Sequence, residues 1–153
     1  MATVISNEAV SKDFYLLKAA GQFNGRMGQF CMLRAWGEYP GLSRPISIFD
    51  CDEESISFLF KVVGQGTELL AQLKAGDTID VQGPYGNGFP AVCGKVALVG
   101  GGIGVAPLYL TAKKMKEQGN AVDLYLGFTE EALLREQYEA VCDKLTVNVG
   151  GYI

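Results

Sequence analysis

The sequence has 153 residues, of which 48% are hydrophobic and 20% are charged, and its formal net charge is −4. A chain of this length and composition is typical of one globular domain, or of two small ones that share an interface. Its 13 basic residues are scattered, which excludes the basic stripe of a nucleic-acid-binding protein, and it has no histidine, which excludes imidazole catalysis and histidine-ligated metal.

The first ninety residues have the pattern of short antiparallel strands. Runs rich in Val, Ile, Phe and Tyr, separated by clusters of Gly, Asn, Asp and Pro, predict strands over 13–20, 29–35, 43–50, 55–63 and 78–82. One helix, over 66–73, interrupts them and ends before the turn "KAGD". This succession predicts an antiparallel β-barrel.

From Lys95 onward, strands alternate with helices. We expect apolar strands over 95–100 and 121–127, helices over 105–118 and 130–141, and a last strand over 145–149. This alternation predicts a parallel βαβ sheet. We therefore divide the chain into a barrel domain (1–92) and a partial nucleotide-binding domain (95–153), because three strands are about half of a doubly wound sheet.

The four cysteines lack the spacing of a metal site. No C-x-x-C or C-x4-C pair occurs among Cys31, Cys51, Cys93 and Cys142, so the zinc and iron–sulfur signatures are absent. We interpret them as isolated buried thiols in a reducing cytosol. Neither a signal peptide nor an apolar run as long as a membrane span is present. We therefore expect a cytoplasmic location, with no membrane and no nucleic acid among the partners.

The segment "VGGGIGVAPL" places four glycines, Gly100, Gly101, Gly102 and Gly104, between a strand and a helix. Glycine lets backbone N–H groups approach a diphosphate, and the helix N-terminus adds favourable partial charge. The spacing is not G-x-G-x-x-G. The alternative is a tight strand-to-helix turn that binds nothing.

Three shorter motifs lie in the barrel region, and each allows a plain structural alternative. In "VGQGTELL", Gly64 and Gly66 permit a turn that could hold an anion, or Thr67 simply caps a helix. In "SRPISIF", Arg44 could reach a phosphate and Ser47 a ring heteroatom, although this tetrapeptide is common on surfaces. The turn "QGPYGNGF" is either a cofactor contact or a loop between domains.

Together, the order and spacing of these motifs resemble the ferredoxin–NADP reductase superfamily. Within it, "RPISI", "KVVGQGT", "GPYGNGF" and "LVGGGIGVAPLY" are most similar to the electron-transfer subunits of dihydroorotate dehydrogenase. The resemblance implies that the first glycine turn holds a flavin diphosphate, hence FAD rather than FMN, and that the second holds the diphosphate of a nicotinamide dinucleotide.

The resemblance assigns cofactor binding to three segments and implies no catalytic side chain. They comprise Arg44, Pro45, Ile46 and Ser47; then Leu59, Phe60, Lys61, Gly66 and Thr67; and finally Gly100, Gly101, Gly102, Gly104, Ala106 and Pro107. Because Ile46 stands where plant-type reductases have an aromatic residue, no ring stacking is expected there.

In this family, NADH reduces FAD, and electrons then cross a [2Fe–2S] cluster to an FMN-bearing dihydroorotate dehydrogenase catalytic subunit of pyrimidine biosynthesis. The family's cluster cysteines lie in a C-terminal segment that this sequence lacks. We therefore expect a C-terminally truncated member that keeps FAD, binds NAD(H) weakly and has no cluster. Glu130 and Glu131, after Thr129, favour NADH over NADPH.

Two alternative hypotheses remain for the function. The chain could be a related NAD(P)H-dependent reductase subunit that serves a ferredoxin or a hydrogenase. It could also be a non-catalytic remnant that acts as a binding module, in which case it would hold no flavin and oxidise no NADH.

Overall fold

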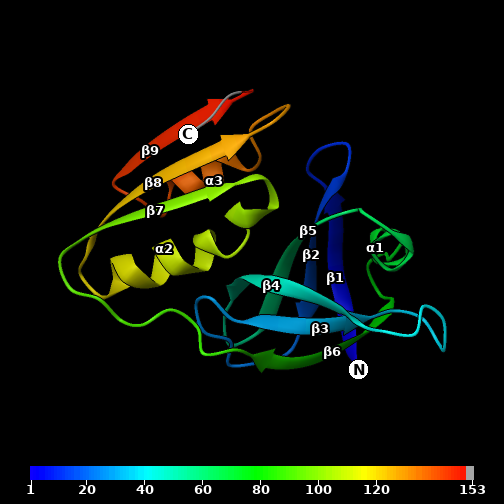
Figure 1. Ribbon diagram of the computed structural model, residues 1–153. Helices are drawn as coiled ribbons and strands as arrows, with labels where there is room; N and C mark the ends of the chain where they lie inside the picture. Colours follow the sequence, from blue (N-terminus) through cyan, green and yellow to red (C-terminus); the bar gives the residue numbers. More distant parts are fainter. Residues whose placement is uncertain (151–153) are drawn as a thin grey trace.

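The first part of the chain is a closed antiparallel barrel (Figure 1). The computed structural model describes residues 1–150. The barrel strands follow the order β1-β2-β5-β4-β3-β6 and comprise β1 (Ala2–Ala9), β2 (Phe14–Ala20), β3 (Phe30–Arg34), β4 (Arg44–Cys51), β5 (Ser55–Lys61) and β6 (Thr78–Tyr85). Pairing of Ala2 with Ile79 closes the ring, and helix α1 (Gln65–Ala71) lies in the connection between β5 and β6.

Alternating apolar side chains build the barrel core. Leu17 of β2 pairs with Phe58 of β5, and both are fully buried, as is Ile48 of β4. Because successive residues of a strand point to opposite faces, Leu59 lies on the face opposite Phe58. Leu59 is nevertheless only 1% exposed, since the short 3-10 helix Gly102–Val105 lies against β5. The second part of the chain therefore covers the outer face of this strand.

The second part is a parallel sheet with the order β7-β8-β9. Its strands are β7 (Lys95–Gly101), β8 (Ala121–Phe128) and β9 (Lys144–Val149), and its helices are α2 (Leu108–Glu117) and α3 (Arg135–Glu139). Figure 1 shows both helices on one face of the sheet, with α2 between the sheet and the barrel. The predicted fold class, an antiparallel barrel followed by a parallel βαβ unit, is confirmed.

Three elements differ from the sequence prediction. Strand β1 was not predicted, because polar Asn7 and Glu8 interrupt its apolar pattern. The helix expected over 130–141 is confined to α3, because Leu134 adopts a left-handed conformation (φ 51°) just before it. The helix expected over 105–118 begins as the 3-10 turn and continues as α2 from Leu108.

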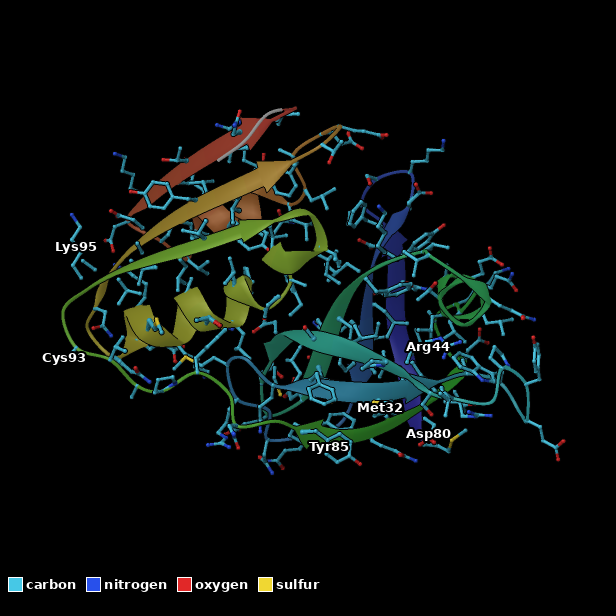
Figure 2. All side chains as sticks on the ribbon, viewed as in Figure 1. Met32, Arg44, Asp80, Tyr85, Cys93 and Lys95 are labelled. Atoms are coloured by element: carbon cyan, nitrogen blue, oxygen red, sulfur yellow. The ribbon has the colours of Figure 1, made fainter. Side chains whose placement is uncertain are left out.

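The segment between β6 and β7 has no regular secondary structure. It contains the boundary between the two predicted domains, 1–92 and 95–153. Figure 2 shows Cys93 and Lys95 at the side of the molecule where this segment rises to the sheet. The division into domains stays a prediction.

Asn7, on the strand that was not predicted, anchors the last turn of α1. Its side-chain amide donates to the carbonyl of Leu70 (2.9 Å), in the last turn of α1, and to that of Leu73 (3.0 Å), just beyond the helix. We expect Asn7→Ala to lower the free energy of unfolding by about 1–3 kcal/mol. Chemical denaturation followed by circular dichroism measures this. Asn87→Ala, at an exposed turn position, is the control, and equal effects of the two substitutions would contradict the role of Asn7.

Candidate cofactor-binding site

A cavity of about 490 Å³ lies where β4 and β5 meet the turn that follows β7. Small-molecule sites typically enclose about 300–1,000 Å³. The lining consists of Arg44, Pro45, Ile46, Ser47, Leu59, Phe60, Lys61, Val63, Thr67, Ile103, Gly104, Ala106 and Pro107. Segments that lie far apart in the sequence therefore meet around one cavity. Gly104, Ala106 and Pro107, which the resemblance assigned to the nicotinamide dinucleotide, line the same cavity as the residues assigned to the flavin. The role of both groups in binding stays a prediction.

Arg44 is a charged residue of the cavity lining. Its Nη1 donates to the Leu42 carbonyl (3.0 Å), and its guanidinium lies 5.9 Å from the centre of the Trp36 ring. The side chain also crosses Gly66, where an added Cβ would lie 2.5 Å from Arg44 Nε. Gly66 is therefore needed for close approach. A permanent cation thus lies beside the first turn of α1, whose backbone N–H groups have no acceptor within the helix.

The hydroxyl groups of Thr67 and Ser47 differ in their hydrogen bonds. Thr67 Oγ1 accepts hydrogen bonds from the N–H groups of Val63 (2.8 Å) and Gly64 (3.0 Å), and Thr67 is only 4% exposed. It fixes the turn before α1. Ser47 lines the cavity, and within residues 1–150 its hydroxyl has no hydrogen-bond partner. Ser47 is therefore free to bind a polar group of a ligand.

The wall between these polar groups is apolar. Leu59 and Phe60 are each 1% exposed, and half-buried Ile46 lies on the neighbouring strand. Lys61 ends this wall, with its ammonium 5.7 Å from the centre of the Phe14 ring. Val63 and Ile103 complete the lining. Both lie within the quoted motifs, but neither was assigned to the site, because single apolar residues carry no signature of binding.

A second cavity, of about 210 Å³, adjoins the first, since Lys61 and Ile103 line both. Gly102, Phe128 and the segment 129–131 form its other side, at the carboxyl ends of β7 and β8. Ligands of open α/β sheets bind at this end of the strands. The cavity therefore contains the predicted Gly102 and the acidic pair Glu130 and Glu131.

Other predicted elements are not part of the lining of either cavity. Gly100 supports the turn, because an added Cβ would lie 2.6 Å from Leu108 Cδ1, and Gly101 ends β7. The turn "QGPYGNGF" packs on the barrel instead, where Gln29 Nε2 donates to the Gly86 carbonyl (2.8 Å) and the Phe89 N–H to that of Met27 (2.9 Å). Figure 2 shows Tyr85 on the lower side of the barrel.

Three aromatic rings hold the second part of the chain against the barrel. Phe49 of β4 stacks on Tyr109 of α2, with centroids 4.5 Å apart, and Tyr138 of α3 meets both edge-on. The Tyr138 hydroxyl donates to the Val105 carbonyl at 2.5 Å. Burial, with a smaller effect of Tyr109, raises the pKa of Tyr138, so this hydroxyl stays a donor. The contact fixes the turn that lines the cavity.

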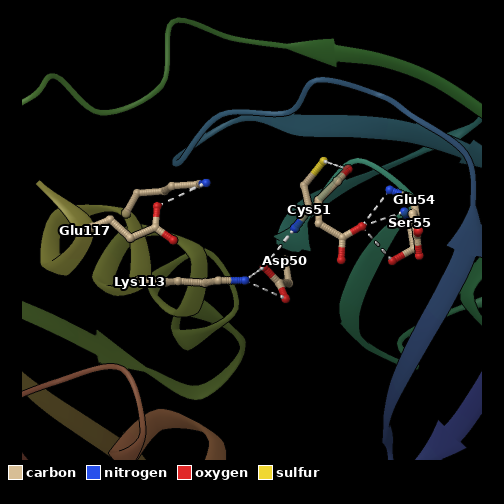
Figure 3. A network of polar contacts seen from close by, with 8 residues as sticks. Asp50, Cys51, Glu54, Ser55, Lys113 and Glu117 are labelled. Carbon is tan, nitrogen blue, oxygen red and sulfur yellow. Dashed lines mark hydrogen bonds and ion pairs between the residues drawn. The ribbon is translucent and has the colours of Figure 1, made fainter.

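An ion pair crosses the same interface. Lys113 Nζ of α2 lies 3.1 Å from Asp50 Oδ1 of β4, and that oxygen also accepts from the Cys51 N–H (Figure 3). Partial burial opposes the charge of Lys113, but its hydrogen bond to Asp50 and the charge of Asp50 outweigh this effect and raise the pKa of Lys113.

The ion pair predicts a loss of stability at high pH. Because the pKa of Lys113 is raised on folding, its contribution is complete below the ordinary value of 10.5 and disappears as the pH rises through the folded value. We expect Lys113→Met to be less stable than the parent by a constant amount at about pH 7–9, and the difference to shrink above about pH 10.5. Urea denaturation across this range measures it. A difference that does not shrink, or one equal to that of exposed Lys12→Met, would contradict the assignment.

The family model described as "Oxidoreductase FAD-binding domain" matches residues 1–89, the whole barrel. The chain therefore belongs to this family of FAD-binding oxidoreductase domains.

More specifically, the chain is a homologue of the electron transfer subunits of dihydroorotate dehydrogenase B (NAD(+)). The subunit from Clostridium acetobutylicum is 54% identical over 127 residues, which cover 82% of this chain and 51% of that protein. The subunit from Caldanaerobacter subterraneus subsp. tengcongensis is 40% identical over 144 residues, covering 92% of this chain and 56% of the relative. The chain thus spans about half the length of the curated relatives it matches.

A solved structure has the same arrangement of barrel and sheet. The structure of the NADH-dependent reduced ferredoxin-NADP oxidoreductase, described in connection with flavin-based electron bifurcation, has a TM-score of 0.89 and 31% identity. The match covers 99% of this chain and 58% of that one.

The described part of the chain does not meet the requirements of a metal site, a disulfide or a membrane-spanning helix. Within residues 1–150, no group of three or more Cys, Asp or Glu side chains is arranged to hold a metal ion. All four cysteines are free thiols, and Cys31 and Cys51 are buried as expected. The expectation of burial is wrong for Cys93, which is exposed, and for Cys142, which is half-buried. No helix in this range is long and apolar enough to cross a membrane.

Proposed function

We propose that this chain is an electron-transfer flavoprotein subunit that binds FAD in the 490 Å³ cavity. The observation that carries the proposal is the placement of Arg44 across Gly66 at the start of α1, together with the partnerless hydroxyl of Ser47 on the same cavity. A cationic end, an apolar wall and a polar group match a flavin dinucleotide, which has a diphosphate, a planar ring system and polar ring atoms. Membership of an FAD-binding family supports this assignment.

The residues present fit the cofactor. Arg44 and the first-turn N–H groups of α1 would hold the diphosphate, since a guanidinium binds phosphate oxygens in a bidentate manner. Ser47 would bind a polar atom of the ring system, and Leu59 and Phe60 would shield the ring from water. A diphosphate site favours FAD over FMN. Bound FAD supplies the redox chemistry by accepting a hydride and giving up single electrons.

We infer that the electron donor is NADH and that it approaches the second cavity. This cavity adjoins the proposed flavin site through Lys61 and Ile103 and lies at the carboxyl ends of parallel strands. Glu130 and Glu131 line it, and their negative charge would repel the 2′-phosphate of NADPH. We further propose that the two sites belong to a barrel domain (1–92) and to part of a dinucleotide-binding domain (95–153).

The proposed electron acceptor is an FMN-bearing dihydroorotate dehydrogenase catalytic subunit. The names of the two relatives support this partner. The four free thiols agree with the reducing cytoplasm as the location. A second candidate acceptor is a ferredoxin, because the 31% identical structure is that of a ferredoxin-NADP oxidoreductase.

Anaerobic stopped-flow spectroscopy tests the donor. The chain is loaded with FAD and mixed with NADH or NADPH, and the loss of flavin absorbance is followed. We expect slow reduction that rises with NADH concentration without saturating, because the described sheet has three strands rather than the two βαβαβ halves of a full dinucleotide domain. NADPH should react more slowly still. Faster reaction with NADPH would contradict the donor proposal.

The acceptor is tested separately. The reduced chain is mixed with a dihydroorotate dehydrogenase catalytic subunit or with an oxidised ferredoxin, and reoxidation of the flavin is followed. The proposal predicts faster reoxidation by the catalytic subunit. Faster reoxidation by ferredoxin would favour the second candidate, and partner binding by a chain that holds no flavin would favour a non-catalytic binding module.

A further inference from the structure

Arg34, at the end of β3, is surrounded by backbone carbonyls of the loop that follows. Its Nε donates to the Trp36 carbonyl (3.2 Å), Nη1 to that of Gly41 (3.3 Å) and Nη2 to that of Pro40 (3.2 Å), with a further contact from Nη2 to Gly37. A guanidinium can do this because it has five N–H donors in a rigid plane. The loop 36–41 is thus closed around one side chain.

The same loop holds Arg44 in place. Trp36 is fixed by its own hydrogen bond from Nε1 to the Pro40 carbonyl (2.8 Å), and its ring contacts both guanidinium groups, 5.5 Å from Arg34 and 5.9 Å from Arg44. The next residue beyond the closed loop, Leu42, supplies the carbonyl that accepts from Arg44 Nη1. Two of the three contacts that restrain Arg44 therefore come from the segment shaped by Arg34, and the third is Gly66.

We propose that Arg34 is a positioning residue for FAD binding. By closing the loop 36–41 it presents the Trp36 ring and the Leu42 carbonyl to Arg44, and so keeps the Arg44 guanidinium across Gly66 at the proposed diphosphate site. Arg34 does not line the cavity and acts through Arg44. This inference rests on the proposed function, which assigns FAD to that cavity.

The proposal separates the two halves of the cofactor. Arg44 would bind phosphate oxygens, whereas the flavin ring would lie against Leu59, Phe60 and Ser47. Loss of Arg34 should therefore weaken ligands that carry the diphosphate and leave riboflavin, which has no phosphate, unaffected. A general loosening of the barrel would weaken both ligands alike.

The test is a fluorescence-quenching titration of the full chain with FAD and with riboflavin. Arg34→Lys keeps the charge and most of the side-chain length but replaces the fork by a single ammonium. We expect its FAD affinity to fall about tenfold while riboflavin affinity is unchanged. In an Arg44→Ala background, Arg34→Lys should cause no further loss of FAD affinity. Arg135→Lys, exposed on α3, is the matched control.

Three results would overturn the proposal: unchanged FAD affinity, equal losses for FAD and riboflavin, or additive losses in the double variant. If Arg34→Lys does not fold, Trp36→Ala and Trp36→Phe replace it. Trp36→Phe keeps an aromatic ring and should retain most FAD affinity, whereas Trp36→Ala should lose about as much as Arg34→Lys, and equal affinities of these two variants would count against the proposal. A parent chain that binds neither FAD nor riboflavin would instead contradict the proposed function itself.

Discussion

Replacing Arg44 by Ala is expected to lower the affinity for FAD by about 10- to 100-fold. Arg44 is the cation that lies across Gly66 beside the first turn of α1, on the cavity wall. A hydrogen bond to a charged group contributes about 1.5–3 kcal/mol, and about 1.4 kcal/mol corresponds to a tenfold change in affinity. Titration of the flavin-free chain with FAD measures the effect.

Two further variants make this experiment specific. Arg44→Lys keeps the positive charge but cannot bind two phosphate oxygens in a fork, so its affinity should fall between those of the parent and Arg44→Ala. Arg26→Ala, at an exposed barrel position outside the cavity lining, should bind FAD as the parent does. FAD binding by Arg44→Ala that matches the parent would remove Arg44 from the site.

The second large effect concerns stability. Tyr138 is fully buried, contacts Phe49 and Tyr109 edge-on and donates to the Val105 carbonyl. Tyr138→Ala should lower the free energy of unfolding by about 3–5 kcal/mol, as expected for removal of a buried aromatic ring. Denaturation followed by circular dichroism measures this.

Tyr138→Phe separates the ring from the hydroxyl. It keeps the packing but leaves the buried Val105 carbonyl without its donor, which should cost about 1–3 kcal/mol. If both variants lose less than about 1 kcal/mol, the aromatic cluster does not hold the turn in place.

Local patterns were enough to predict most of the strands. β5 and β8 are short apolar runs bounded by turn residues, and this length and these boundaries are typical of strands. β1 was not predicted, because half of its residues are exposed to solvent. Its Asn7 side chain binds the Leu70 carbonyl of α1 and does not pack in the core. The helix expected over 130–141 is shorter in the structure because of tertiary packing. Leu133 is only 2% exposed and lines the second cavity, and Leu134, which follows it, has a left-handed conformation.

In the candidate site too, some features could be predicted from local sequence patterns and others depend on the folded structure. Arg44, Ser47 and Lys61 belong to short motifs that the resemblance assigned to one cofactor. The structure places them on the neighbouring strands β4 and β5, around one cavity. Contacts that depend on the conformation of a loop have no recognisable pattern in the sequence. The closure of the loop 36–41 around Arg34, and the packing of Trp36 against Arg44, became visible only in the folded chain.

The most direct test of the proposed FAD site is whether the purified chain retains FAD. The protein is mixed with FAD, passed through gel filtration, and its absorbance spectrum recorded; the ligand released by heat is then identified by chromatography. We predict a yellow protein that carries about one FAD per chain and that does not retain FMN under the same treatment. A correctly folded but colourless chain would contradict the assignment of the cavity between β4, β5 and the second glycine turn as a flavin site.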